Sequence, residues 1–428
     1  MPSAYGNMTA GELDEAIASL ESEAAELKAR GLSLDMARGK PSPEQVALSL
    51  PILDVLTSSA DLVDEGIDAS NYGCPDGLPS ARALGANLLG VDPSQVIAAG
   101  SSSLELMYSL VSKAFSTGVR GDAPWSEQGP VRFLCPAPGY DRHFAITQHF
   151  GIENVPVRMR GDGPDMDEVE RLVEGDPSVK GIWCVPKYQN PTGVTFSDEV
   201  VRRFVSMRPA ARDFRIFWDN AYCVHDLVEP GETVMNVFDA LALADVTDRV
   251  YEFASTSKVT LPGSGLAWLA ASPSDIADVK ATLSLERVCP NKIVQLAHVR
   301  YLKDVAGITE HMAEQAKVLR PRFDLVERKL SEGLGGLGVA TWTHPKGGYF
   351  VSFDGPAGSA KAIVALAAQL GVKLTPAGAT WPGGVDPDDT NIRIAPTYPS
   401  LEDLSAALDV FVVCVRLVSA RLARDARG

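Results

Sequence analysis

A run of small hydroxylated residues is the first segment of this sequence whose residue types could bind a ligand. Gly100 and Ser101–Ser103 precede the apolar stretch 104–115, which has the pattern of a helix. Free backbone amides at a helix start, together with neighbouring hydroxyls, can hold a phosphate group. Because simple capping would explain the same residues, this segment alone leaves both interpretations open.

A carboxylate and an amine follow two further apolar runs. Asp219 comes directly after the run 215–218, with Tyr222 three residues later. Lys258 lies between the run 250–254 and a Gly-rich turn. A lysine amine can form an imine with a carbonyl compound and, once released, act as a base. Each residue alone has an ordinary explanation, since an isolated aspartate is usually a helix cap and an isolated lysine is usually solvated.

The elements that must position these residues follow from the periodicity of the chain. Between about residues 75 and 305, short apolar runs alternate with helical patterns, which predicts a mainly parallel sheet covered by helices on both faces. Ligands bind such sheets at the carboxyl ends of the strands, so the polar segments and the turn 190–193 should lie together. The apolar runs are 131–135, 155–159, 181–185, 215–218, 250–254 and 266–271.

A chain of 428 residues is too long for one compact core and predicts two domains. We expect a large domain over residues 61–305 and a smaller α+β domain over residues 306–428, which the N-terminal segment 1–60 joins. Thr9 and Glu12 predict a capping box at the start of a first helix. In the smaller domain we expect helices over 308–331, 359–370 and 400–422 and strands over 348–353 and 391–394.

Composition argues against several classes of protein. The formal net charge of −16 disfavours nucleic acid or an anionic membrane surface as the main partner. Six scattered cysteines without a CxxC pair predict reduced core residues, and no apolar stretch approaches the roughly 20 residues of a membrane span. With no signal-peptide pattern at the N-terminus either, we expect a cytoplasmic protein. We expect no metal ion at the site.

Taken in order along the chain, the serine-rich helix start, the Asn-Pro turn at Asn190, Asp219 with Tyr222, and the lysine turn resemble the fold-type-I pyridoxal-phosphate (PLP) aminotransferases of the class I/II superfamily. The resemblance extends from about Asn71 to Pro399. It implies an α/β fold whose large domain contains a mainly parallel sheet of the seven-stranded type, beside a smaller α+β domain. It also implies pyridoxal 5'-phosphate as the cofactor, amino acids and 2-oxo acids as substrates, and a homodimer with shared active sites.

The resemblance assigns a role to each of these residues. Lys258 would bind the cofactor aldehyde covalently and then move a proton between the substrate Cα and the cofactor. Asp219 would pair with the pyridine nitrogen and keep it protonated, with His143 in support. Further cofactor contacts would come from Tyr140 stacked on the ring, Asn190 and Tyr222 at the ring hydroxyl, Ser101, Ser102, Ser103, Ser255 and Ser257 at the phosphate, and Tyr72, which usually reaches the phosphate of the other subunit.

The resemblance also implies the substrate contacts. Arg393 would bind the substrate α-carboxylate, because a planar guanidinium matches a carboxylate better than an ammonium does. The segments 37–42, 138–147, 218–222 and 346–350 resemble a narrower group, the bacterial MocR-like aspartate aminotransferases, which implies aspartate or glutamate with 2-oxoglutarate or oxaloacetate. The distal carboxylate of such substrates needs a second cation. The candidates are Arg142 first, then Arg38, whose loop also contributes Gly39 to the predicted substrate site together with Asn190, and then Arg287 and Lys292.

The sequence departs from the family pattern at one position. Many members carry a phosphate-binding arginine a few residues after the lysine, where this chain has Gly265. The phosphate must therefore be held by hydroxyls, amides or a cation from elsewhere, so the predicted set of phosphate contacts is incomplete. The narrower group is expected to share this departure. His225 and His298 are assigned structural roles.

Three alternatives to the aspartate reaction stay open. The first is an aminotransferase for aromatic or small neutral amino acids, including alanine–glyoxylate exchange, which the sequence does not distinguish. The second is another PLP reaction, such as β-elimination or decarboxylation, although Arg393 argues against decarboxylation because it would hold the carboxylate in place. The third is a PLP-sensing transcription regulator, which would need a basic DNA-binding module where this chain has an acidic N-terminal segment.

Overall fold

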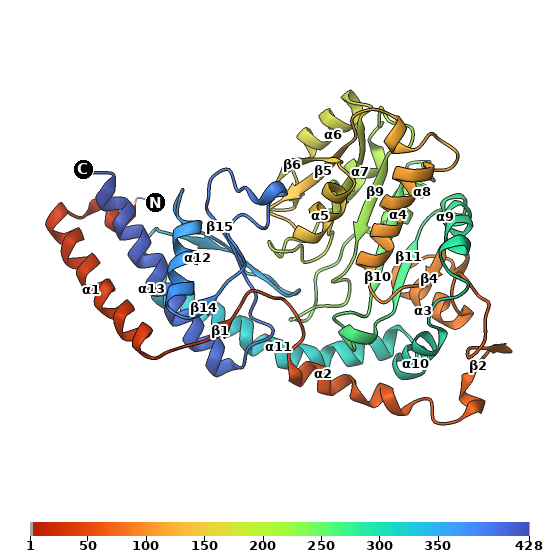
Figure 1. Cartoon of the computed structure of the whole chain (residues 1–428), viewed down its shortest axis with the longest axis horizontal. Helices are drawn as coiled ribbons and strands as arrows, with labels where there is room; N and C mark the ends of the chain where they lie inside the picture. The colour runs from red at the N-terminus through yellow and green to blue at the C-terminus, as the bar shows by residue number, and fades with distance from the viewer. Residues whose placement is uncertain (1–2, 428) are drawn as a thin grey trace.

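A mixed sheet of eight strands forms the centre of the larger part of the computed structural model, which describes residues 3–427 (Figure 1). Strand β11 runs antiparallel to both of its neighbours and β7 runs antiparallel to β6, whereas the other neighbouring pairs run parallel. The predicted, mainly parallel α/β sheet is confirmed. In spatial order the strands are β4 (Val96–Ala98), β11 (Ala267–Ala270), β10 (Val250–Ser255), β9 (Arg215–Asp219), β8 (Val179–Cys184), β5 (Arg132–Ala137), β6 (Glu153–Arg160) and β7 (Gly163–Pro164). The last of these has only two residues, which is too short for apolar periodicity to reveal, and it makes the sheet one strand larger than the expected seven-stranded type.

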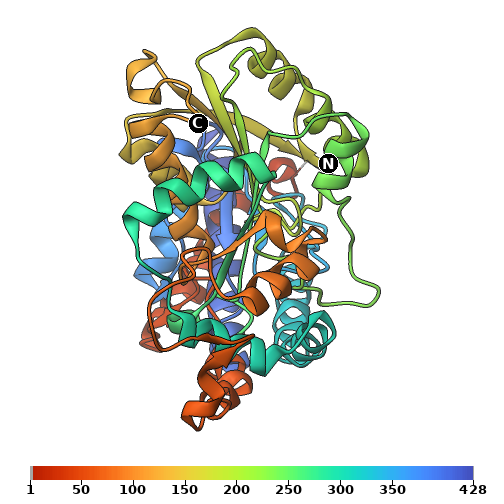
Figure 2. The ribbon, with the colours of Figure 1, turned by 90° about the vertical axis from the view of Figure 1, so that its right-hand side faces the viewer.

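Helices lie on both sides of this sheet (Figure 2). Successive side chains of a strand point to opposite faces, so Phe217 joins the core under α4 while Trp218 packs against Phe204 of α7. One face is covered by α4 (Ser103–Thr117), α5 (Asp141–His149) and α9 (Pro273–Glu286), the other by α6 (Met166–Gly175), α7 (Asp198–Ser206) and α8 (Val237–Leu243), and the β4–β11 end by α3 (Pro79–Leu89) and α10 (Lys292–Leu302).

The smaller part is built on a three-stranded antiparallel sheet with long helices packed against it (Figure 1). The N-terminal segment joins this part, because α1 packs against α13 and β1 pairs with β14. The predicted capping box of Thr9 and Glu12 is confirmed. The elements are α1 (Ala10–Ala29), β1 (Leu34–Asp35), α11 (Val305–Leu334), β12 (Thr341–Trp342), β13 (Val351–Asp354), α12 (Ala360–Gln369), β14 (Val372–Lys373), β15 (Asn391–Ile394) and α13 (Leu401–Asp425).

Two shorter features connect the two parts. Helix α2 (Pro43–Ser49) packs beside α11, so the N-terminal segment continues from the smaller part along the lower edge of the molecule in Figure 1. Strands β2 (Val63–Asp64) and β3 (Ile67–Asp68) form a separate hairpin near α10. Over residues 3–427, no helix combines the length and the apolar character that a membrane span requires.

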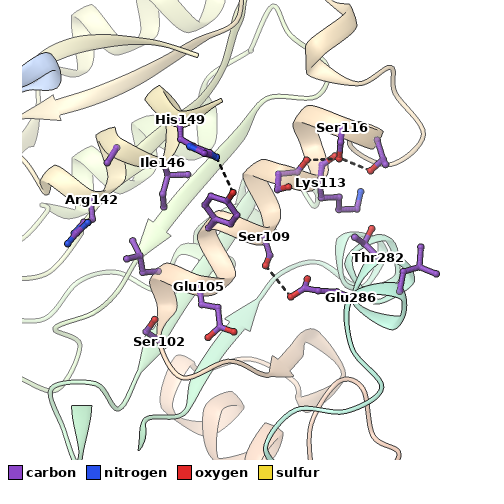
Figure 3. Close-up of a pocket in the computed structure, with 16 residues that line it drawn as sticks. Ser102, Glu105, Ser109, Lys113, Ser116, Arg142, Ile146, His149, Thr282 and Glu286 are labelled. Carbon is purple, nitrogen blue, oxygen red and sulfur yellow. Dashed lines mark hydrogen bonds between the residues drawn. The ribbon is translucent and has the colours of Figure 1, made fainter. Parts of the chain in front are cut away.

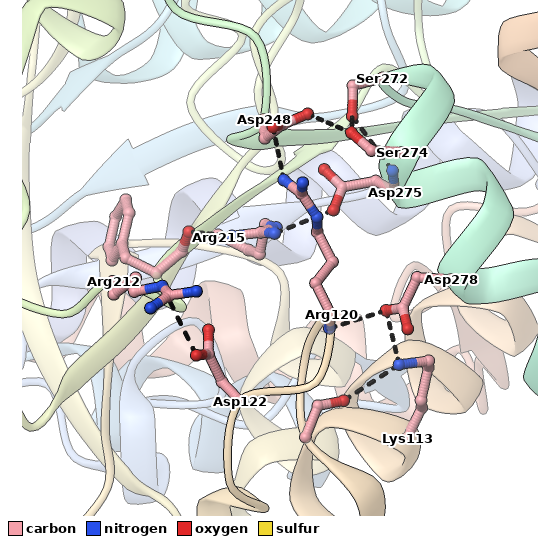
Figure 4. Close-up of polar contacts among 12 residues, drawn as sticks. Lys113, Arg120, Asp122, Arg212, Arg215, Asp248, Ser272, Ser274, Asp275 and Asp278 are labelled. Atoms are coloured by element: carbon pink, nitrogen blue, oxygen red, sulfur yellow. Dashed lines mark hydrogen bonds and ion pairs between the residues drawn. The ribbon is translucent and has the colours of Figure 1, made fainter.

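Ion pairs fasten α9 to the sheet and to α4 near the amino end of β9, away from the carboxyl ends of the strands (Figure 4). Arg215, the first residue of β9, donates through Nη2 to Asp275 Oδ1 at 2.8 Å, and these side chains are 3% and 0% exposed. Lys113 of α4 donates to Asp278 of α9 at 2.6 Å. Because both side chains of the first pair are buried, water cannot solvate either charge when its partner is removed.

Asp275→Ala is therefore expected to lower the free energy of unfolding by about 3–5 kcal/mol, because it leaves the buried Arg215 guanidinium without its counter-charge. Urea unfolding followed by fluorescence measures the loss. Asp198→Ala is the control, since its pair with Arg202 is 60% and 55% exposed and should contribute about 0–1 kcal/mol. Equal losses in the two variants would contradict the assignment.

Candidate functional site

A cavity of about 140 Å³ lies at the carboxyl ends of the central strands. Ligands bind α/β sheets at this edge, and the chain brings its predicted polar segments together there. The predicted residues that line the cavity are Ser102, Ser103, Tyr140, Asn190, Asp219, Tyr222, Ser255, Ser257 and Lys258. Segments that lie more than 150 residues apart in the sequence thus meet around one space.

Asp219, the last residue of β9, has one oxygen held and one oxygen free. Its Oδ2 lies 3.0 Å from His143 Nε2, and both side chains are buried. The His143 ring is stacked on Trp183, with 4.6 Å between the ring centroids and 12° between the planes. Asp219 Oδ1 is buried and has no hydrogen-bond partner among the residues described. A protonated ring nitrogen is a donor that would satisfy this oxygen, so the site fits the pyridine ring of PLP.

Lys258 lines the cavity beside two tyrosine rings. Its Nζ lies 5.0 Å from the ring centroid of Tyr222 and 5.9 Å from that of Tyr349. Desolvation lowers the pKa of Lys258, the Asp219 carboxylate opposes that shift, and the Arg393 guanidinium adds to it. A lowered pKa increases the fraction of neutral amine, which is the form that attacks a carbonyl carbon.

The serine segment supplies a helix start with free donors. Ser102 is the N-cap of α4, and its side chain makes no capping hydrogen bond, so the first amides of α4 are available to a ligand. On the other side of the cavity, Ser255 Oγ donates to Ser257 Oγ at 3.1 Å. Ser101 lies outside the cavity lining, where its backbone amide donates to the Glu105 carboxylate at 2.9 Å. Glu105 is therefore a neighbour of the predicted phosphate cradle that the sequence analysis missed.

The glycine at position 265 has a steric reason. A Cβ atom at Gly265 would lie 2.3 Å from the carbonyl oxygen of Ser101, so no side chain fits without moving the backbone before α4. The lysine turn and the serine segment approach each other at this point, and Ser257 Oγ donates to the same carbonyl at 3.4 Å. An arginine at this position is incompatible with this backbone.

We expect Gly265→Ala to weaken cofactor binding by about tenfold or more, because relieving such a contact typically costs about 1–3 kcal/mol. The measurement is an absorbance titration of the cofactor-free protein with PLP. Gly263→Ala in the same turn is the control, since a Cβ there meets no atom within 4 Å and its affinity should be unchanged. A Gly265→Ala protein with unaltered affinity would show that the turn adapts freely.

Arg393 on β15 extends from the smaller part toward the cavity with one edge held and one edge free. Its Nη1 donates to Asp141 Oδ1 at 3.2 Å and to Asn190 Oδ1 at 3.3 Å. Its guanidinium carbon lies 4.8 Å from the ring centroid of Phe350. The buried Nε has no partner among the described residues, so the edge formed by Nε and Nη2 can donate two hydrogen bonds side-on to a carboxylate.

The other predicted cations lie farther out. Arg142 is exposed at the start of α5, at the edge of a neighbouring groove of about 980 Å³ between α4, α5 and α9 (Figure 3). Arg38 is exposed in its loop. Arg287 pairs with Glu286 at 2.7 Å. Lys292 is buried and donates to the carbonyl oxygens of Asp68 and Tyr72 at 3.3 and 3.2 Å, so it supports a loop and does not line the cavity.

Two further predicted residues, Gly39 and Tyr72, do not line the cavity. Gly39 packs against Phe350, because a Cβ at position 39 would lie 2.3 Å from Phe350 Cζ. It therefore sits behind the ring that supports Arg393. Tyr72 is 78% exposed and lies outside the cavity lining. His298 Nε2 lies within hydrogen-bond distance of Thr256 Oγ1 and Thr260 Oγ1 in the lysine turn, at 3.1 and 2.8 Å, as a structural role would require.

Some contacts of the site were not predicted from the sequence. Asp141, Phe350 and Trp183 hold Arg393 or His143, yet each lies beside or inside a segment that the sequence analysis had already singled out. Asp141 and Phe350 occur in the segments 138–147 and 346–350, and Trp183 occurs in the apolar run 181–185. The segments that contain these residues could therefore be identified from the sequence, but the contact partner of each residue could not.

Comparisons with known proteins agree with this geometry. Residues 8–426 match the family model described as aspartate amino-transferase. An aspartate aminotransferase of Corynebacterium glutamicum is 41% identical to this chain over 396 residues, which cover 92% of this chain and 91% of that protein. The crystal structure of an aspartate transaminase from Corynebacterium glutamicum superposes with a TM-score of 0.95 at 39% identity, over 99% of this chain and 100% of that one.

A more distant structure shares the fold. The α-aminoadipate aminotransferase of Thermus thermophilus, solved with N-(5'-phosphopyridoxyl)-L-leucine, superposes with a TM-score of 0.73 over 94% of this chain and 96% of that one. At 22% identity this likeness concerns the fold alone.

Proposed function

This chain belongs to the aspartate amino-transferase family and is an aminotransferase, and from that premise we propose that it uses PLP to convert aspartate and 2-oxoglutarate into oxaloacetate and glutamate. The main support for the proposal is that two of three groups line one cavity and the third contacts its lining. Asp219 has a free buried oxygen and Lys258 presents an amine in the cavity, and Arg393 donates to Asn190 of the lining while its Nε stays free.

The residues that would hold the cofactor surround the cavity. Asp219 would bind the ring nitrogen through Oδ1, while His143 fixes Oδ2. Tyr140 would stack on the ring, and Asn190 and Tyr222 would bind its hydroxyl oxygen. The amides of Ser102 and Ser103 and the hydroxyls of Ser255 and Ser257 would hold the phosphate, with Ser101 as a further candidate if Glu105 releases it. When bound, the cofactor supplies a sink for the electrons left when the α-proton departs.

The chain's own residues would move the proton and orient the substrate. Lys258, whose pKa is lowered by desolvation, would take the proton from the substrate Cα through Nζ and return it on the cofactor side. Arg393 would hold the α-carboxylate side-on through Nε and Nη2. Asp141 and Asn190 keep Nη1 occupied and so fix the plane of the guanidinium.

For the distal carboxylate we propose Arg142 first and Arg38 second, in keeping with the MocR-like aspartate aminotransferase group. Both guanidinium groups are exposed and so are free to move, and the relative from Corynebacterium glutamicum is named an aspartate aminotransferase. One observation favours the second candidate function, an aminotransferase for neutral amino acids. The Asp141 carboxylate lies beside Arg393, where it would repel a second substrate carboxylate that came close.

We also propose a cytoplasmic homodimer with the domain boundaries 1–60, 61–305 and 306–428. Tyr72, at 78% exposure, would reach the site of a second copy, and Leu285, which lines the groove between α4, α5 and α9, is 88% exposed. Apolar side chains exposed to this degree around a groove are typical of a surface that another chain covers. Light scattering would measure the oligomeric state.

The experiment that tests the substrate class is a panel of half-reactions with single amino acids. Aspartate and glutamate should react about 10- to 100-fold faster than alanine or phenylalanine, the difference expected from one charged hydrogen bond. Arg142→Ala should lose this preference and keep the visible absorbance band. Arg202→Ala, which removes an exposed arginine on α7, is the control and should behave like the wild type. If neutral amino acids react equally well in the wild type, the neutral amino-acid function replaces the aspartate one.

A further inference from the structure

The main-chain carbonyl of Lys258 is approached by two side chains that do not line the cavity. Tyr349 Oη donates to it at 3.4 Å, and His225 Nε2 lies 3.3 Å from it. Tyr349 precedes β13 in the smaller part, and His225 follows β9 in the larger part. The lysine is therefore held from both parts of the molecule.

The direction of the Tyr349 hydrogen bonds is fixed by a third residue. Gln45 in α2 accepts from the Ser42 amide through Oε1 at 3.0 Å, so its Nε2 must face Tyr349 Oη, which lies 3.0 Å away. Burial raises the pKa of Tyr349, so its hydroxyl keeps its single proton. Because Gln45 donates to that oxygen, the tyrosine proton is free to point at the Lys258 carbonyl. Gln315 of α11 buttresses Gln45, accepting from its Nε2 at 3.0 Å.

His225 has a defined protonation state for the same reason. Its Nε2 faces a carbonyl oxygen and must carry a proton, while its buried Nδ1 has no partner among the described residues. Burial, with the charge of Lys258 in addition, lowers the pKa of His225 to about 3, so the ring stays neutral. The ring packs edge-on against Tyr222 and Tyr349, with centroid distances of 5.5 and 5.6 Å.

The residue after Tyr349 contacts the other end of the site. Phe350 lies under the Arg393 guanidinium and packs against Gly39. Two consecutive residues therefore touch the lysine and the carboxylate clamp. Both are backed by the N-terminal segment, Tyr349 through Gln45 and Phe350 through Gly39. A shift of this segment would move both groups together.

We propose that Tyr349 is a positioning element that sets the Lys258 amine at the correct distance from a substrate held at Arg393. Gln45 supports Tyr349, and His225 holds the same Lys258 carbonyl from the larger part. This inference rests on the proposed function and assigns no bond-breaking role to the three residues. Its effect is on orientation, and a displacement of about 1 Å can cost about 10²-fold in rate. His225 then has a functional role in addition to the structural one expected from the sequence.

The test begins with Tyr349→Phe, which removes one oxygen and keeps the ring. We expect kcat with aspartate to fall about 10- to 100-fold while KM changes by less than about threefold, because the substrate clamp is retained. The pH midpoint of the visible absorbance transition of the holoenzyme should also shift, since the lysine that binds the cofactor is displaced. Tyr251→Phe removes a buried hydroxyl from β10 beside Arg215 and is the control that should change neither quantity.

Two further variants keep the test decisive if Tyr349→Phe does not fold. Gln45→Glu keeps the acceptor for the Ser42 amide but turns the donor that faces Tyr349 into an acceptor, which draws the tyrosine proton away from Lys258. It should reproduce the Tyr349→Phe result. His225→Phe should do the same, and His225→Gln, which restores a donor, should recover part of the rate.

Wild-type kcat and an unshifted absorbance midpoint in Gln45→Glu and His225→Phe would overturn this inference. That outcome is distinct from failure of the proposed function. If the wild-type protein gives no visible band with PLP, the function itself is wrong, whereas a normal wild-type band with unaffected variants removes only the positioning role.

Discussion

Lys258→Ala is expected to abolish amino transfer, with a loss of about 10⁴-fold or more, and to remove the visible absorbance band of the lysine-bound cofactor. Lys258 lines the cavity, and its Nζ lies 5.0 and 5.9 Å from the ring centroids of Tyr222 and Tyr349. One side chain would provide both the covalent attachment and the proton transfer, so its loss removes two contributions together. Absorbance spectra and single-turnover rates with aspartate measure them.

The control for this variant is Lys317→Ala, which removes an ammonium that is 70% exposed on α11. It should keep both the band and the rate. An added primary amine, methylamine, should restore part of the proton transfer in Lys258→Ala without restoring the covalent attachment. A Lys258→Ala protein that transfers amino groups at a rate near that of the wild type would contradict the assignment of the base.

Asp219→Asn is expected to lower the rate by about 10³-fold, because an amide of the same shape removes the charge that favours a protonated ring nitrogen. Losing one partner of a buried ion pair costs about 3–5 kcal/mol, which corresponds to about 10²- to 10⁴-fold. Asp219 is 2% exposed, so solvent does not replace the missing charge. Affinity for PLP should also fall, and an absorbance titration measures it separately from the rate.

His143→Gln is the comparison for Asp219→Asn, because it removes a support of the carboxylate and leaves the carboxylate in place. The His143 contact at 3.0 Å orients Asp219 from behind, so we expect a smaller loss of about 10- to 100-fold. Equal losses in the two variants would mean that the orientation of Asp219, and not its charge, is what the site requires. Wild-type rates in Asp219→Asn would contradict its pairing with the ring nitrogen.

The arrangement of the sheet could be predicted from the sequence because its signal is local. Continuous apolar runs such as 215–218 became buried strands, and the order of the polar segments placed Asp219 and Lys258 at one edge. Strand β9 extends one residue beyond the predicted run, and this residue is Asp219 itself. A buried carboxylate can end a strand when a partner such as His143 is present.

The contacts between distant segments could not be predicted in the same way. Arg393 meets Asp141 across 252 residues, and Gln45 meets Tyr349 across 304 residues. Such pairings depend on how the smaller part packs against the larger one, and no single-segment pattern records that packing. Gly265 shows the same limit, since its close approach to Ser101 is visible only once both segments are placed in space.

Arg142 illustrates how far sequence proximity can guide a site assignment. It is two residues from Tyr140, which lines the cavity, but α5 begins between them. A helix turns successive side chains in different directions, so Arg142 is exposed at the edge of the neighbouring groove in Figure 3. Its proposed contact with a distal carboxylate therefore requires the side chain to swing toward the cavity, which the half-reactions of Arg142→Ala test.

The role of Lys258 is tested most directly by trapping the bond between the protein and its cofactor. The holoenzyme is reduced with borohydride, digested, and mapped by mass spectrometry for a phosphopyridoxyl group on lysine. We expect the label on Lys258, and we expect prior reaction with aspartate to prevent labelling, because amino transfer releases the lysine. A label on another lysine such as Lys187, or no label on a protein that binds PLP, would contradict this role.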